Sequence, residues 1–80
     1  MTEGIHKTFP VAMLSEGEKA RIVSIEGGAG VRKKLTDLGI LPGKFIQVAH
    51  GSGRGPRVLV VDDTKVMVGQ GMLHKIIVEL

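Results

Sequence analysis

The sequence has 80 residues, no cysteine, and a net charge of +3 from 11 lysines and arginines against 8 aspartates and glutamates. A chain of this length makes one small domain. The lack of cysteine excludes disulfides and thiolate metal sites and favours a reducing compartment. The small excess of basic residues suits binding to nucleic acid, binding to an acidic partner, or solubility alone. No stretch approaches the roughly 18 apolar residues of a membrane span, and residues 1–10 lack the apolar core of a signal peptide, so we expect a soluble cytoplasmic protein.

The first 25 residues predict a loose terminus followed by one strand. Residues 1–9 are polar and show no periodicity, so we expect the folded domain to occupy residues 10–80. A short edge segment is predicted for residues 10–14, and turn-forming residues follow it. Residues 19–25 have strand composition. Strict alternation along this strand would place Ala20, Ile22 and Ser24 on one face, and Arg21, Val23 and Ile25 on the other.

One stretch in the middle of the chain, residues 30–43, has the pattern of a helix with both ends marked. Val31, Leu35 and Leu38 recur at helical spacing, which predicts an apolar stripe that faces the core. The charged and polar side chains between them are expected to point to solvent. We expect the rest of the chain to be organised around this helix.

The end of the helix carries a strong stop signal. Gly39 follows the last apolar residue of the stripe, and a left-handed residue at this position would let Ile40 fold back onto Leu35. Residues 41–44, Leu-Pro-Gly-Lys, fit a type II turn, because proline presets its first central position and Gly43 accepts the positive φ of its second.

The second half of the chain predicts four strands separated by turn-forming residues. These strands are expected at residues 45–50, 57–61, 66–68 and 75–80. The run 57–61 is almost entirely apolar and β-branched, a pattern that suits a strand covered on both faces. One helical turn is predicted at residues 72–74. Ile76, Val78 and Leu80 are expected to share one face of the last strand.

Five short strands and one helix predict a mainly β fold. Strands with so many valines and isoleucines cannot form a stable open sheet with one wet face, so we expect closure into a small five-stranded SH3-like barrel. The short α-helix would lie between the first and second long strands, where it could cover one end or side of the barrel.

The order of these motifs resembles the FeoA family of ferrous iron transport proteins. The most specific piece is the Leu-x-x-Leu-Gly-Ile-Leu-Pro-Gly run at residues 35–43, with Gly17-Glu18 before the first long strand and Gly55-Pro56 before the valine-rich hairpin. The resemblance covers residues 13–80. It implies an SH3-like barrel, a cytosolic location, and contact with the membrane-embedded FeoB protein, which carries a cytoplasmic GTP-binding domain. It supplies no catalytic residue.

Similar domains are also found at the C-terminus of iron-responsive repressors of the DtxR type. No helix-turn-helix precedes the domain in this sequence, so a free-standing FeoA protein is the better match. A regulatory domain related to that of the repressors is kept as an alternative.

The glycine-rich segments do not support a nucleotide site, a cofactor or an enzyme. Residues 39–45 contain Gly-Lys, but they have three rather than four residues between the glycines, lack the magnesium-binding Ser or Thr, and follow a helix. No helix follows residues 51–55, so a hairpin loop is favoured over a dinucleotide site. Ser24, Thr36 and the histidines form no nucleophile–base pairing.

The histidines and the paired aspartates are the candidate metal ligands. His6, His50 and His74 lie far apart in three elements without the spacing of a zinc site, which favours solvated surface residues. Asp62 and Asp63 could offer two carboxylates to a hard cation, but adjacent aspartates are typical of a hairpin turn. The sequence therefore predicts no resident metal, and weak binding of transition metal ions at best.

Four residues are predicted to contact a partner protein. Arg32 and Lys33 point away from the apolar stripe, Lys44 follows in the turn, and Leu41 is the apolar turn residue least needed for the helix end. An apolar anchor rimmed by basic side chains suits the cytoplasmic part of an FeoB-type transporter, which could recruit the protein to the inner face of the membrane.

A basic nucleic-acid-binding barrel is the alternative class of function. Lys44, Arg54 and Arg57 could extend the basic side chains of the helix into a patch. Base stacking normally needs several exposed aromatic residues, however, and this chain has only Phe9 and Phe45. Strong salt dependence of binding to nucleic acid would separate the two classes. Self-association is left open.

Overall fold

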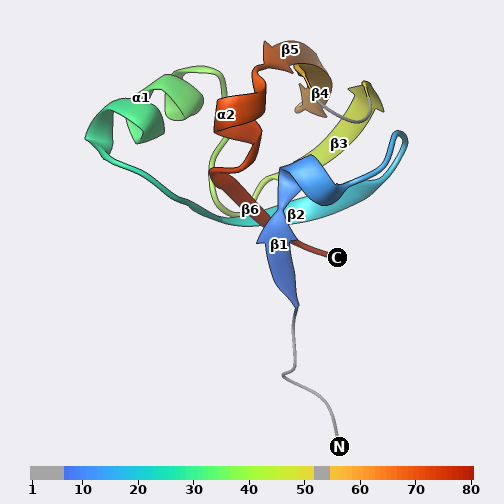
Figure 1. Ribbon diagram of the computed structural model, residues 1–80, viewed down its shortest axis with the longest axis horizontal. Coiled ribbons are helices and arrows are strands. Elements are labelled where there is room, and N and C mark those ends of the chain that lie inside the picture. The colour runs from blue at the N-terminus through green and yellow to red at the C-terminus, as the bar shows by residue number, and fades with distance from the viewer. Residues whose placement is uncertain (1–6, 52–54) are drawn as a thin grey trace, which may run out of the picture.

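The computed structural model describes residues 7–51 and 55–80, which form one six-stranded antiparallel sheet with two short helices (Figure 1). The elements in chain order are β1 (Thr8–Pro10), the 3-10 helix η1 (Val11–Met13), β2 (Lys19–Ile25), α1 (Ala29–Asp37), β3 (Phe45–His50), β4 (Arg57–Val61), β5 (Thr64–Val68), α2 (Gln70–Leu73) and β6 (Ile76–Glu79). The strand order is β1-β6-β2-β3-β4-β5, and every neighbouring pair is antiparallel.

The prediction of a closed five-stranded barrel is wrong in strand number and in closure. Six strands are present among the described residues, and no ladder joins β1 to β5. The extra strand is β1, in which Thr8 pairs with Glu79 and Phe9 with Val78. The predicted loose segment is therefore wrong for Thr8 and Phe9, while residues 1–6 lie outside the described residues. Sequence periodicity could not reveal a three-residue strand whose order comes from its partner.

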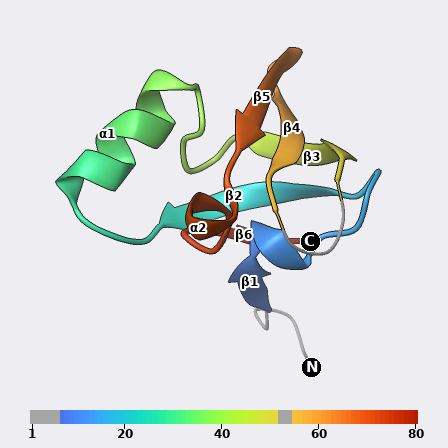
Figure 2. The ribbon, with the colours of Figure 1, turned by 45° about the horizontal axis from the view of Figure 1, so that its top comes forward.

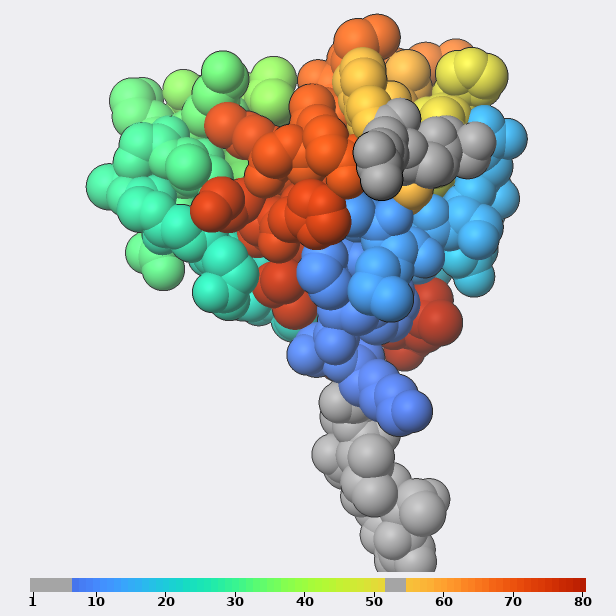
Figure 3. Space-filling model, in the orientation of Figure 1, coloured from blue at the N-terminus to red at the C-terminus, as the bar shows by residue number. Residues whose placement is uncertain are grey.

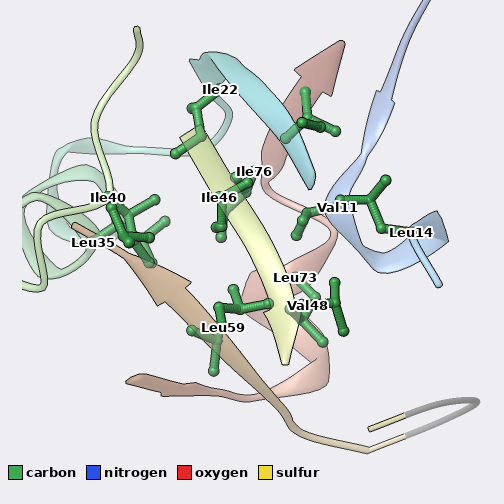
Figure 4. Close-up of a cluster of buried hydrophobic side chains, with 14 of the residues drawn as sticks. Val11, Leu14, Ile22, Leu35, Ile40, Ile46, Val48, Leu59, Leu73 and Ile76 are labelled. Carbon is green, nitrogen blue, oxygen red and sulfur yellow. The ribbon is translucent and has the colours of Figure 1, made fainter. Parts of the chain in front are cut away.

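The core is covered by short helical turns where the sheet is open. Among the described residues, the inward side chains of the strands include Ile22, Ile46 and Ile76, all fully buried (Figure 4). η1 and α2 contact each other and contribute buried Val11 and Leu73. Figure 3 shows these two segments side by side on one face of the molecule. The predicted edge segment at residues 10–14 is therefore mostly this 3-10 turn.

Helix α1 stands at one side of the sheet and is held mainly by one residue (Figure 2). Leu35 is completely buried, and Val31 is half-buried against the core. Leu38, predicted as the third residue of the stripe, is 37% exposed. The helix ends at Asp37, and Leu38 has the cap conformation φ −88°, ψ 0°, so its side chain has left the helical face.

The predicted helix end is confirmed in detail. Gly39 has φ 87°, its N–H donates to Thr36 O at 2.9 Å, and the N–H of Ile40 donates to Leu35 O at 2.9 Å. This pair of hydrogen bonds is the Schellman motif, and the accompanying apolar contact joins Ile40 to Leu35 (Figure 4). The turn that follows is also confirmed, because Gly43 has φ 94° and Lys44 N–H donates to Leu41 O.

The turn after α1 is tied to β2 at a single residue. Gly43 N–H donates to Ile22 O at 2.7 Å, and Ile22 N–H donates to Lys44 O at 2.8 Å. Ile22 is fully buried, so these two hydrogen bonds hold the end of the helix to the centre of the sheet. We call residues 41–44 the helix turn.

β2 has the predicted bounds but not the predicted faces. Its pairing with β6 shifts register between Ile22 and Ser24, and this bulge places Ile25 on the buried side with Ile22. Val23 and Ser24 are both left half-buried. An extra residue opposite one partner residue reverses the alternation, which explains why a strict period of two was wrong beyond Ile22.

The remaining strands agree with the sequence except at their ends. β3 and β4 have the predicted bounds, and β5 starts earlier, at Thr64, because the turn contains only two residues. Asp62 and Asp63 have φ of 53° and 63°, the pattern of the tight type I′ hairpin. Leu80 is 77% exposed, so it does not share the buried face of β6.

Replacing Gly39 with alanine should lower the free energy of unfolding by about 1–2 kcal/mol, because a Cβ disfavours the left-handed conformation. A Cβ at Gly39 would meet no atom within 4 Å, so the loss comes from the backbone alone. Gly30→Ala is the matched control: that site is equally open and lies inside α1, where alanine stabilises by up to about 1 kcal/mol. Urea denaturation measures both changes, and effects of the same sign would contradict the cap.

Candidate interaction surface

Two of the four predicted contact residues lie on α1, and the other two are the first and last residues of the helix turn. Arg32 and Lys33 are exposed on α1, and Lys33 Nζ lies 3.4 Å from Asp37 Oδ2 on the next helical turn. Leu41 and Lys44 are half-buried. The two basic residues of α1 and Lys44 therefore belong to different elements.

Lys44 forms an ion pair with Asp62 at the tip of the β4–β5 hairpin. This pair is largely exposed, so it adds little stability, but it fixes the direction of both side chains. Arg32 has no ion-pair partner among the described residues. It is the predicted cation that is best able to meet a carboxylate of another molecule.

A hollow of about 280 Å³ lies between α1, β2 and the helix turn; we call it the helix hollow. Its lining residues are Val23, Ser24, Ile25, Arg32, Thr36 and Pro42. Val23 and Ser24 lie at the register shift of β2, and both line this hollow. The sequence identified Arg32 only, since the bulge depends on the register of β2 against β6.

A larger hollow of about 470 Å³ lies on the other side of the helix turn, over the outer face of β2, β3 and β4. It includes Lys44, and Phe45 is 58% exposed in it. An adjoining hollow of about 350 Å³ shares Lys19 and Phe45 and extends to Leu80. We call this continuous recess the sheet hollow. Sequence reasoning did not predict Phe45 as a contact residue and considered it only as a strand residue and as one of the two aromatics available for base stacking. An aromatic at an outward position of the strand was the available signal.

Arg57 does not contribute to a basic surface. It is 7% exposed in β4, and its Nη1 donates to Leu14 O at 2.6 Å, linking β4 to the segment after η1. The interpretation of Arg57 as part of a basic patch is therefore wrong. Arg54 lies outside the described residues.

The described histidines lie beside single neighbouring side chains, and the paired aspartates form a turn. His50 Nδ1 lies 3.5 Å from Glu16, and His74 Nε2 lies 2.9 Å from Gln70 Nε2; His6 lies outside the described residues. Within residues 7–51 and 55–80, no three His, Asp or Glu side chains could hold a metal ion together. Asp62 and Asp63 occupy the left-handed positions of the hairpin turn, as predicted.

The backbone after α1 cannot cradle a phosphate. The N–H groups of Gly39, Ile40, Gly43 and Lys44 all donate to carbonyl groups of the chain itself. The glycine-rich residues 51–55 are described only at Gly51 and Gly55, so the loop predicted there lies mostly outside the described residues. In the part of the chain that the structure describes, no helix has the length and apolar character needed to cross a membrane.

A small, mainly β, SH3-like fold with shallow recesses on its surface is typical of a binding domain. The FeoA domain family matches residues 9–80, and the chain belongs to this family. A protein of Methanocaldococcus jannaschii named Fe(2+) transport protein A is 30% identical over 71 residues, which cover 89% of this chain and 85% of that protein. These findings link the chain to ferrous iron transport.

Two solved structures have a fold similar to that of this chain. The crystal structure of an iron uptake regulatory protein, FeoA, has a TM-score of 0.86 and 30% identity, and the match covers 91% of this chain and 97% of that one. A manganese-dependent transcriptional repressor has a TM-score of 0.84 and 14% identity over 94% of this chain and 42% of the repressor. The second likeness shows the shared fold, as the resemblance to DtxR-type repressors implied.

Calorimetric titration of the purified protein with Zn²⁺, and with Fe²⁺ under anaerobic conditions, should reveal no stoichiometric submicromolar site, because the described ligands do not converge. His50→Ala and His74→Ala should leave the weak binding unchanged. A tight site that either substitution abolishes would contradict this prediction.

Proposed function

We propose that this protein is a cytosolic accessory of ferrous iron uptake that binds the cytoplasmic part of an FeoB-type transporter. The observation that carries the proposal is membership of the FeoA family over residues 9–80. The protein acts by contact and has no catalytic role, because the surface of the described residues offers recesses and charged rims rather than paired reactive groups. Its partner recruits it to the inner face of the membrane.

The contact surface is centred on α1 and the helix turn. Arg32 and Lys33 are exposed, and Lys44 lies at the far side of the turn, so a partner with acidic groups meets cations on both sides of Leu41. The charges mainly speed encounter, whereas the apolar residue of the turn holds the complex. Leu41 is half-buried, so it contributes to binding through the part of its side chain that stays accessible.

The alternative of nucleic-acid binding has less support. Phe45 is the one exposed aromatic side chain among the described residues, since Phe9 is half-buried. Proteins that bind single strands stack successive bases on several aromatic rings. One ring beside scattered lysines does not provide such a platform.

Leu41→Glu should weaken binding to the solubilised transporter by about tenfold or more, because it places a charge in the apolar centre of the contact. Arg32→Ala and Lys33→Ala should each weaken binding only a few-fold, mainly by slowing association, and this effect should fade at high salt. Surface plasmon resonance at two salt concentrations, with the transporter in each nucleotide state, separates these effects.

Lys7→Ala is the control for loss of a positive charge, because Lys7 is exposed next to β1 and far along the sheet from α1. Circular dichroism and thermal unfolding establish that each variant is folded. If all three folded variants bind as the parent does, the surface is misplaced. If the parent binds in no nucleotide state, the partner is wrong.

A further inference from the structure

The outer face of the sheet carries exposed apolar side chains beside charged residues, which include Lys19 and the Arg21–Glu79 ion pair. Val58 and Val60 point outward from β4 and are only half-buried. Their cross-strand neighbours on β5 are Met67, which is 70% exposed, and Lys65. On β3, Phe45 is 58% exposed. An antiparallel sheet with one wet face normally alternates between apolar inward and polar outward residues, and β4 does not.

The run 57–61 predicted a strand covered on both faces, and the chain covers only one of them. Arg57, Leu59 and Val61 are buried on the inner side. The helix turn borders the outer side, where Lys44 reaches Asp62, and the sheet hollow opens beside Val60. The second cover that the valines indicate must therefore come from another molecule.

We infer that a second copy of this chain covers the outer face, with a two-fold axis close to Phe45. Two such sheets can pack face to face with interdigitating side chains, as in a β-sandwich. In an isologous contact the Phe45 side chain of each copy would enter the sheet hollow of the other. A central, well-packed aromatic residue is typical of the energetic centre of an interface.

The charges around Phe45 favour a second copy over a partner of one charge sign. Lys19 lies on the β2 side of Phe45, and Asp63 lies on the side of the β4–β5 hairpin. Neither has an ion-pair partner among the described residues. A two-fold axis near Phe45 brings Lys19 of one copy toward Asp63 of the other, so the face is complementary to itself.

A stable dimer would bury a modest share of the surface of this chain. A standard interface buries about 800 Å² on each partner, which is roughly a sixth of the 5003 Å² surface of this chain. Residues of β2, β3, β4 and β5 contribute to the outer face, whereas Arg32 and Lys33 lie on α1. The outer face and the proposed transporter contact share Lys44, which borders the sheet hollow, whereas Arg32, Lys33 and Leu41 do not line that hollow.

Sedimentation equilibrium of the full chain over a range of concentrations tests the inference. The parent should be a dimer with a micromolar dissociation constant, and Phe45→Ser should raise that constant at least tenfold. Met13→Ser is the matched control, because Met13 is 69% exposed but lies on η1, away from the outer face. Its dissociation constant should stay within twofold of the parent value, and both variants should show the circular dichroism spectrum of the parent.

A charge reversal and its rescue test the position of the axis. Lys19→Glu should weaken the dimer at least fivefold, because it would face Asp63 of the second copy. Adding Asp63→Asn removes the repulsion and should recover at least threefold of the loss, and asparagine tolerates the left-handed φ of 63° at this position. Asp63→Asn alone should weaken the dimer slightly.

Three results would overturn the inference. The first is a parent protein that stays monomeric at all concentrations. If Phe45→Ser then weakens binding to the transporter, the outer face belongs to that partner. The second is a dimer that Phe45→Ser leaves unchanged. The third is a failure of Asp63→Asn to rescue Lys19→Glu, which would remove the two-fold axis from Phe45.

Discussion

Two backbone hydrogen bonds between buried Ile22 and the helix turn fix the geometry on which both surfaces depend. They hold residues 43 and 44 against β2, while the apolar contact of Ile40 with Leu35 holds the last turn of α1 against the core. α1 is short and exposes most of its residues, so its own helical propensity could not keep it in place. The helix hollow and the sheet hollow lie on opposite sides of this one attachment, and each would lose a wall if the turn moved.

The sheet stays open, and other segments cover its core in place of a closing ladder. A three-residue edge strand, η1 and α2 cover the region that a closing ladder would cover in a barrel, and Arg57 links this cover to β4 through the carbonyl of Leu14. A hydrogen bond from a charged donor to a carbonyl contributes about 1.5–3 kcal/mol, and it adds to the burial of Val11 and Leu14 in holding this segment. The buried arginine thus belongs to the architecture of the domain rather than to its binding surface.

Local chemistry explains which features could be predicted from the sequence. The bounds of β2, β3 and β4, the left-handed Gly39 and the presence of a turn at Asp62 and Asp63 depend on residues close together in the chain, and they were predicted, although the turn was expected to extend to Lys65. The strand at Thr8, the bulge in β2 and the exposure of Leu38 depend on pairing with residues near the other end of the chain or on where the helix stops. The same distinction applies to the contact residues. Arg32 could be predicted from its position on a helical face, whereas Phe45 was recognised from the arrangement of its strand in the sheet.

The pairing of β1 with β6 brings the beginning and the end of the described fold side by side, with Thr8 opposite Glu79. A chain that enters and leaves a domain at one place can be joined to other sequences without crossing its surface. The same arrangement allows this fold to be part of a longer protein. The match to the manganese-dependent repressor covers 42% of that chain. It also means that a fluorescent protein or an affinity handle fused at either end would project from the same side of the molecule, away from α1 and the helix turn.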